Sequence, residues 1–205
     1  MSQKGKFIAL VGGEGSGKGT IIAHLRKVLA GENVLFTREP GGTSLGDKIR
    51  DLLLNEPMSM TTELLLFEAA RAEHIAQVIA PSLTRGTHVI SDRFDACTWA
   101  YQIMGRWHGK HADFFRLVND KVVGKHSPDL YLFCDISPKI AVKRRLTAGG
   151  EVTRFDKEAQ IFHEAVYRGY KNFLKDKPHV SIDTTVGIST MTHAAEAVVR
   201  TALGL

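Results

Sequence analysis

Hydrophobic positions along this chain follow two alternating patterns. Short runs of apolar, β-branched and aromatic residues predict buried strands. These strands are expected at residues 7–11, 33–37, 87–91, 129–134 and 179–182. Longer stretches repeat apolar residues at helical spacing and predict helices at about 18–30, 61–79, 95–105, 111–124, 137–146, 157–176 and 189–203, the second of which is expected to stop before Pro81. Strands that alternate with helices in this way are typical of an α/β fold, a parallel sheet with helices on both faces.

The length and composition of the chain predict a single globular domain over residues 1–205. A hydrophobic fraction of 43% suffices for a full core, and no repeat or linker divides the chain. The N-terminal apolar run is too short for a signal peptide, and no later run is long enough to span a membrane. Cys97 and Cys134 show no CxxC spacing, which is typical of a reducing compartment. We therefore expect a cytoplasmic protein without a membrane partner.

A glycine-rich segment between the first strand and the first helix predicts a phosphate-binding loop. Its sequence matches G-x-x-x-x-G-K, and its glycines let the backbone N–H groups point at phosphate oxygens. The helix N-terminus adds partial positive charge, and Lys18 adds a full charge for the β- and γ-phosphates of ATP. The residues expected to bind ATP are Gly12, Gly13, Glu14, Gly15, Ser16, Gly17, Lys18, Gly19 and Thr20.

The residue after this lysine departs from the usual motif. Ser or Thr commonly follows the lysine and binds Mg²⁺, but here Gly19 stands there and Thr20 comes next. We expect Mg²⁺ to be held by Thr20 or largely through water, which this ion retains readily. Asp92, at the end of the third strand, is expected to hold its water shell.

Two further motifs follow the second and third strands, at the same edge of the predicted sheet. The segment Thr37–Thr43 reads TREPGGT, in which Arg38 is suited to clamping a phosphate and the Pro-Gly-Gly turn brings backbone near a ligand. The alternative is a surface turn with a solvated arginine. After the third strand, Arg93 is expected to point at the transferred phosphate, and the alternative is a salt bridge at the strand end.

Together these motifs resemble the bacterial-type thymidylate kinases, which phosphorylate dTMP to dTDP with ATP and Mg²⁺. The resemblance covers nearly the whole chain and rests on GGEGSGKGT at 12–20, TREPGGT at 37–43, LLLFEAARAEHI at 64–75, DRFDACTWAYQ at 92–102 and TRFDKE at 153–158. TREPGGT is its most specific motif. The resemblance implies a three-layer phosphate-loop kinase fold with a short lid at about 147–156. It also implies a homodimer formed through helices such as 61–79 and 95–105.

The resemblance assigns roles to individual residues. Phe67 would stack on the base, Arg71 would bond a thymine carbonyl, and Tyr101 would crowd a ribose 2′-hydroxyl. The other residues implied to bind dTMP are Thr98 and Gln102 along the base, Glu14 at the sugar, and Arg38 with Arg93 at the acceptor phosphate. Lys18, Arg93 and a lid arginine, Arg154 before Arg145, would be catalytic. Phe94, Cys97 and the GKGT ending depart from the usual family sequence.

Two other activities fit the same motifs. One is a nucleoside-monophosphate kinase of broader base preference, which the GKGT ending suggests. The other is a nucleoside kinase, which would need a carboxylate base beside the sugar, such as Glu14 or Asp95. The run Lys143-Arg144-Arg145 is typical of a solvated helix end, so we expect nucleotide substrates and no nucleic-acid partner.

Overall fold

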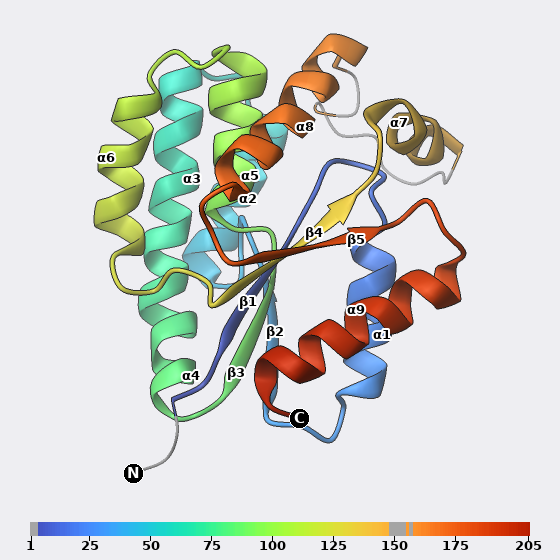
Figure 1. The fold of residues 1–205 in the computed structure, drawn as a ribbon. Coiled ribbons are helices and arrows are strands. Elements are labelled where there is room, and N and C mark those ends of the chain that lie inside the picture. Colours follow the sequence, from blue (N-terminus) through green and yellow to red (C-terminus); the bar gives the residue numbers. More distant parts are fainter. Residues whose placement is uncertain (1–3, 148–154, 156–157) are drawn as a thin grey trace.

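Five strands form one parallel sheet in the order β2-β3-β1-β4-β5 (Figure 1). The computed structural model describes residues 4–147, 155 and 158–205. The strands are β1 (Phe7–Val11), β2 (Val34–Arg38), β3 (His88–Asp92), β4 (Leu130–Asp135) and β5 (His179–Asp183). This confirms the predicted α/β fold and places each strand within one residue of its expected bounds.

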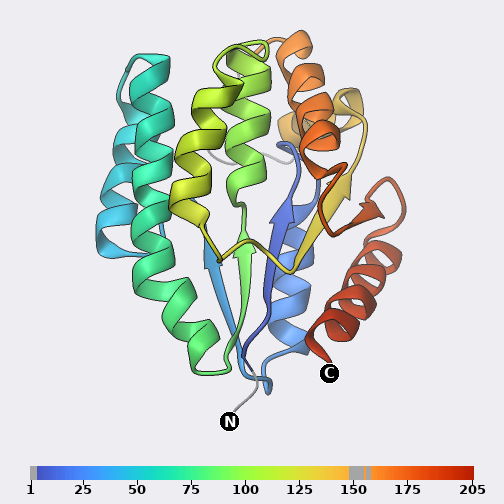
Figure 2. The same ribbon diagram turned by 60° about the vertical axis from the view of Figure 1, so that its left-hand side comes forward.

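Helices cover both faces of the sheet (Figures 1 and 2). They are α1 (Lys18–Val28), α2 (Ser44–Asn55), α3 (Met60–His74), α4 (Ala80–Thr84), α5 (Asp95–Thr98), α6 (Ala112–Val123), α7 (Pro138–Thr147), α8 (Gln160–Leu174) and α9 (Ile188–Leu203). Successive strand residues point to opposite faces. Ile8 and Leu10 of β1 therefore pack in the core under α1 and α9, whereas Phe7 and Ala9 pack under α5 and α8.

Helix α2 was not expected from the sequence, and it follows the TREPGGT segment directly. Thr43 caps its N-terminus by accepting a hydrogen bond from the N–H of Gly46 at 2.9 Å. Only a narrow stripe of α2 is buried, and Ile49 and Leu53 pack there against Ala70 of α3. So narrow a stripe is a weak periodic signal, which explains why the helix was missed.

The expectation that the helix at 61–79 stops before Pro81 was wrong. A π-helical segment, η1 (Ile75–Ile79), joins α3 to α4 without a break. Here the N–H of Ala80 bonds the carbonyl of Ile75, five residues earlier. Proline lacks an N–H and crowds the preceding turn of a regular helix, and this wider turn accommodates it. A second π-helical segment, η2 (Trp99–Arg106), extends α5 over the predicted helix at 95–105.

The loops at the carboxyl ends of the strands gather at one edge of the sheet, where ligands bind in such folds. Most of the expected lid, 148–154 and 156–157, lies outside the described residues. Among the described residues, no helix is long and apolar enough to cross a bilayer. Cys97 and Cys134 are both free and buried.

Candidate active site

The phosphate loop has the position that the sequence predicted, between β1 and α1. Gly12, Gly15 and Gly17 all have positive φ, which side chains other than glycine rarely adopt. At Gly15 the loop also touches α7, because an added Cβ would collide with the carbonyl oxygen of Ala141. The loop conformation therefore depends on glycine at these positions.

Lys18 is buried at the first position of α1 and lies over the loop. Its ammonium group donates to the carbonyls of Gly12 and Gly13 at 2.9 and 2.8 Å. It also lies 3.3 Å from the hydroxyl of Ser16. The charge of Lys18 is thus held at the centre of the loop, where phosphate oxygens would approach.

The two residues expected to hold Mg²⁺ lie in different surroundings. Thr20 is exposed on the first turn of α1, and a Cβ added at Gly19 would meet nothing within 4 Å. Asp92 ends β3, beside Leu10 of β1, and its buried Oδ1 has no hydrogen-bond partner among the described residues. A buried carboxylate oxygen without a hydrogen-bond partner is suited to binding a metal ion or the water molecules around one.

A pocket of about 720 Å³, including its open mouth, adjoins the loop. Its lining comes from the loop, the TREPGGT segment, α2, α3, the turn between β3 and α5, α5, η2 and the end of the lid. The lining residues are Glu14, Glu39, Pro40, Arg50, Leu53, Leu54, Phe67, Arg71, Arg93, Phe94, Cys97, Thr98, Tyr101, Gln102 and Phe155. Seven of the eight residues implied to bind dTMP are among them, and only Arg38 is not.

Glu14 links the phosphate loop to this pocket. Its carboxylate accepts hydrogen bonds from Arg93 at 2.5 Å and from the hydroxyl of Tyr101 at 3.3 Å. Burial alone would raise the pKa of Glu14, but the charges of Arg93 and Lys18 outweigh it and lower this pKa to about 2. Glu14 is therefore fully ionised and fixes Arg93, whose own backbone has a positive φ of 71°.

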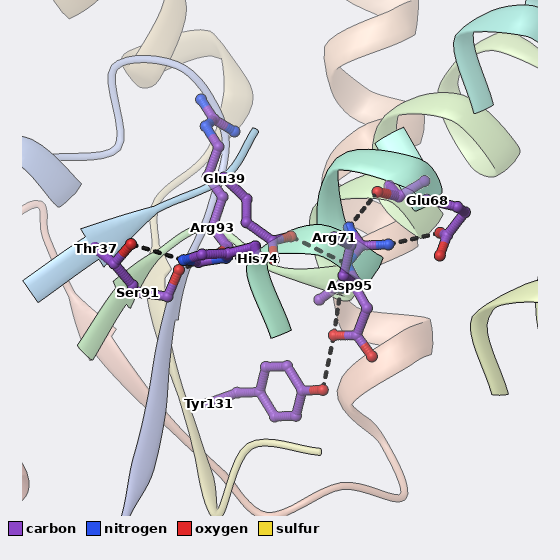
Figure 3. Close-up of polar contacts among 11 residues, drawn as sticks. Thr37, Glu39, Glu68, Arg71, His74, Ser91, Arg93, Asp95 and Tyr131 are labelled. Carbon is purple, nitrogen blue, oxygen red and sulfur yellow. Dashed lines mark hydrogen bonds and ion pairs between the residues drawn. The ribbon is translucent and has the colours of Figure 1, made fainter. Parts of the chain in front are cut away.

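Arg71 of α3 is almost fully buried and has three polar partners (Figure 3). Its Nε donates to Glu39 at 3.0 Å, Nη1 donates to Glu68 at 2.6 Å, and Nη2 donates to Thr98 at 2.8 Å. These neighbouring carboxylates raise its pKa although burial opposes the charged form. Arg71 is thus a fixed cation in the pocket wall, one helical turn from Phe67.

Gln102 lies on η2 at the far side of the pocket. Its amide nitrogen donates to Glu63 at 2.8 Å, so its orientation is fixed with the carbonyl oxygen left for other contacts. Tyr101 packs edge-on against Phe155, with ring centroids 5.6 Å apart. The end of the lid therefore reaches the pocket through Phe155.

The structure does not bring Arg38 into the pocket. Its side chain is 57% exposed and pairs with Asp47 at 3.3 Å. Strand residues alternate between faces, and Thr37 and Glu39 occupy the inward positions on either side of it. The assignment of Arg38 to the acceptor phosphate is therefore not supported by its position and stays a prediction.

Arg50 is the cation that sequence reasoning missed. It lies on α2, lines the pocket, and donates to the carbonyl of Pro40 at 3.1 Å. Burial lowers the pKa of Arg50, and the charges of Arg38 and Arg93 lower it further. An anion in the pocket would relieve this repulsion. The only sequence signal for it is the IRDLLL pattern at 49–54, which is typical of an amphipathic helix.

Of the two candidate lid arginines, only Arg145 is among the described residues. Arg145 lies on α7 beside the loop, with its Cβ 3.2 Å from where a Cβ on Gly15 would stand. Arg154 lies outside the described residues. The order Arg154 before Arg145 stays a prediction.

Comparison with known proteins gives a consistent result over nearly the whole chain. The thymidylate kinase family profile matches residues 10–194. A thymidylate kinase of Burkholderia cenocepacia is 40% identical over 202 residues, which cover 95% of this chain and 97% of that protein. Thymidylate kinases of Thiobacillus denitrificans and Magnetococcus marinus are each 41% identical, covering 87% and 85% of both chains respectively. This chain therefore belongs to the thymidylate kinase family.

Proposed function

We propose that this protein transfers the γ-phosphoryl group of ATP to dTMP, giving ADP and dTDP for dTTP synthesis. Family membership supports this activity, since similar proteins over nearly the full length are named thymidylate kinases. The observation that carries the proposal is Glu14, a residue of the phosphate loop that also lines the neighbouring pocket. Donor and acceptor sites thus share one wall, as direct transfer between two bound nucleotides requires.

On the donor side, the loop residues Gly12–Thr20 would hold the ATP phosphates. Lys18 would neutralise the β- and γ-phosphates, and Arg145 or Arg154 would contact the γ-phosphate from the lid. The closeness of α7 to Gly15 supports Arg145 for this role. Closure of the lid would exclude water, which otherwise competes as acceptor.

On the acceptor side, Phe67 would stack on the thymine ring while Arg71 bonds a carbonyl of the base. Thr98 and Gln102 would line the base edge, and Tyr101 would pack against the deoxyribose. Arg93 and Arg50 would bind the 5′-phosphate, with Arg38 outside the pocket. All of these residues except Arg38 line one cavity, which supports their acting on one ligand.

The chemistry requires positioning and charge neutralisation more than proton transfer. A phosphate oxygen of dTMP is already anionic near neutral pH, so no general base is needed. Lys18, Arg93 and the lid arginine would stabilise charge on the transferring group, each at a fixed position. Asp92, through water, and Thr20 would hold Mg²⁺, which would supply positive charge against the phosphates of ATP.

A nucleoside kinase is a weaker proposal for this site. It would need a carboxylate that takes a proton from the sugar hydroxyl. Glu14 has a pKa of about 2 and is committed to Arg93, which makes it a poor base. Asp95 is buried and accepts hydrogen bonds from Tyr131 and from the N–H of Ala96. Neither carboxylate suits that role.

A panel of acceptors tests the proposal and its broader alternative. ADP release from ATP is measured with dTMP, dUMP, dCMP, AMP and GMP at equal concentrations. The proposal expects kcat/KM for dTMP to exceed that for each other acceptor at least about tenfold, because a methyl or an exocyclic group in a shaped pocket is worth this much. Comparable rates with dCMP or AMP would favour the broader kinase, and no acceptor dependence would refute the proposal.

We also propose a homodimer in the cytoplasm. The expected contact included the helix at 95–105, but residues 94–103 are buried inside their own chain. Helices α3 and α6 lie side by side and expose Leu65, Phe114 and Leu117, which makes this surface the better candidate. Sedimentation of the protein and of a Leu117→Asp variant tests this, since the variant is expected to sediment as a monomer.

A further inference from the structure

The TREPGGT segment contacts the buried end of α3 through two of its side chains. Thr37 and Glu39 occupy alternate positions and face inward, whereas Arg38 between them faces solvent. On α3, Arg71 and His74 are three residues apart and share the face that meets them. Figure 3 shows the resulting group, with Glu39 lying between Arg71 and His74.

Glu39 is the link in this group because its two oxygens have different partners. Oε2 accepts from Nε of Arg71 at 3.0 Å, and Oε1 lies 2.9 Å from Nδ1 of His74. An ionised carboxylate only accepts, so Nδ1 carries the proton in this contact. The other ring nitrogen of His74, Nε2, lies 2.7 Å from the hydroxyl of Thr37. In the neutral imidazole that hydroxyl donates to Nε2, and the chain of hydrogen bonds runs from Thr37 to Arg71.

Gly42 closes over this chain of hydrogen bonds. Its φ is +80°, and a Cβ added there would lie 2.7 Å from Oγ1 of Thr37 and 2.8 Å from Nε2 of His74. Any side chain would press on the contact between them. Four residues of the segment, Thr37, Glu39, Pro40 and Gly42, therefore enclose His74 and Arg71 or line the pocket beside them.

The position of the Arg71 guanidinium depends on these contacts. Its planar group presents five N–H donors in a fixed fork. Glu39 holds the Nε edge, while Glu68 and Thr98 each take one donor from a terminal nitrogen. The bond at Nε fixes the rotation of the fork, and so sets the direction of the terminal N–H groups toward the pocket.

From this arrangement we infer that Glu39 and His74 are positioning residues for base recognition, which act on the ligand through Arg71. The inference rests on the proposed function, because it takes Arg71 as the residue that reads the thymine carbonyl. It assigns the TREPGGT segment a role in holding a base-reading arginine, in addition to any contact with phosphate. Glu39 and His74 transfer no proton to substrate in this role.

Glu39→Gln tests the link with little change of shape. A glutamine has one accepting and one donating end, so it cannot accept from both Arg71 and His74. We expect the dissociation constant for dTMP to rise about 10- to 100-fold, the range for displacing a recognition group by an ångström or less. The constants for ATP and for 2-deoxyribose 5-phosphate, which has no base, are expected to stay within about twofold. Calorimetry gives the first two constants, and ligand-observed NMR gives the third.

His74 gives a graded second test. His74→Leu removes the bond to Glu39, whereas His74→Asn keeps an amide N–H near the position of Nδ1. We expect His74→Asn to recover part of the dTMP affinity that His74→Leu loses. Tyr131→Phe is the matched control, because it removes a buried 2.8 Å hydrogen bond to the neighbouring Asp95 and leaves the three hydrogen bonds of the Arg71 guanidinium in place. The Tyr131→Phe variant is expected to bind dTMP as the wild type does, although its melting temperature should fall about as much as that of the Glu39 and His74 variants.

A double-mutant cycle decides whether the effect passes through Arg71. In an Arg71→Lys background the fork is absent, so adding Glu39→Gln should change dTMP affinity by less than about twofold. Additive losses would overturn the inference, and so would an equal loss of affinity for the base-free sugar phosphate. A Glu39→Gln enzyme that binds dTMP within twofold of wild type would overturn it as well.

The same experiments separate this inference from the proposed function. Wild-type enzyme that releases no ADP with dTMP refutes the proposed function, and the inference falls with it. Wild-type enzyme that turns over dTMP, with Glu39 and His74 variants that bind it normally, refutes the inference alone.

Discussion

Replacing Arg50 and Arg38 separately tests which arginine binds the acceptor phosphate. The resemblance to the family indicates Arg38, whereas the pocket contains Arg50. The two side chains lie close enough for the charge of Arg38 to lower the pKa of Arg50. Arg50→Met and Arg38→Met remove the same charge from the same region and keep a long apolar side chain. Each variant is therefore the control for the other.

The expected magnitudes follow from burial. A hydrogen bond to a charged group in a partly buried site contributes about 1.5–3 kcal/mol. Loss of the contact between Arg50 and a phosphate should therefore raise KM for dTMP about 10- to 150-fold. Arg38 and Asp47 are each more than half exposed, and such pairs contribute about 0–1 kcal/mol. Arg38→Met should therefore raise KM by no more than about fivefold.

Steady-state kinetics with ATP and dTMP measure these changes, with KM for ATP as an internal reference. Thymidine binding supplies a second readout, because thymidine lacks the phosphate and should bind Arg50→Met as it binds the wild type. Arg50 also donates to the carbonyl of Pro40, so melting temperatures are compared in parallel. A larger effect of Arg38→Met than of Arg50→Met would refute the reasoning, and so would an equal loss of thymidine and dTMP binding by Arg50→Met.

Three further predictions follow from the loop and its neighbours. Gly15→Ala should raise KM for ATP at least about tenfold, because φ at Gly15 is +70° and the added Cβ would collide with α7. Gly31→Ala is the control: its Cβ would meet nothing within 4 Å, so KM for ATP should stay unchanged. Gly19→Ser should supply a hydroxyl ligand for Mg²⁺ and so lower severalfold the Mg²⁺ concentration at which the rate is half-maximal. Gly19→Ala should not change this concentration, and equal effects of both variants would indicate helix stabilisation instead. Because Arg93 and Lys18 together lower the folded pKa of Glu14 from 4.5 to about 2, the ionised Glu14 stabilises the fold above about pH 4.5 by ~3 kcal/mol, and this contribution is lost as pH falls toward 2. Urea unfolding of Arg93→Met should therefore show a shallower fall in stability than wild type between pH 5 and 2, and parallel curves would contradict this.

The strands were predictable from sequence because their short apolar, β-branched and aromatic runs alternate with longer stretches of helical periodicity. Phe7–Val11 shows this most clearly, because it is buried at all five positions, as a central strand covered on both faces should be. Helix α2 and the passage of the chain through Pro81 were not predictable in the same way. The first has too narrow an apolar stripe, and the second depends on a π-helical turn, for which no simple sequence pattern exists.

The pocket was predictable only where the family motif named its residues. Phe67, Arg71 and Tyr101 lie at helical positions that by spacing alone indicate core packing. Arg50 belongs to no motif, and only the fold places it in the pocket near Arg93. Long-range placement of this kind depends on the tertiary fold, which local patterns do not encode.

In the TREPGGT segment, the residue types indicate one role and their positions in the fold indicate another. Read as a sequence, its arginine and tight turn indicate a phosphate clamp, because those residue types suit that task. In the folded chain, strand alternation turns Arg38 toward solvent, so that Thr37 and Glu39 are the residues that face α3. A buried carboxylate in that position is costly unless it pairs with a cation, and Arg71 and His74 supply the donors. The residues of the motif are therefore constrained by their fit to a distant segment, α3. A substitution at Glu39 should weaken recognition of the base more than binding of the phosphate.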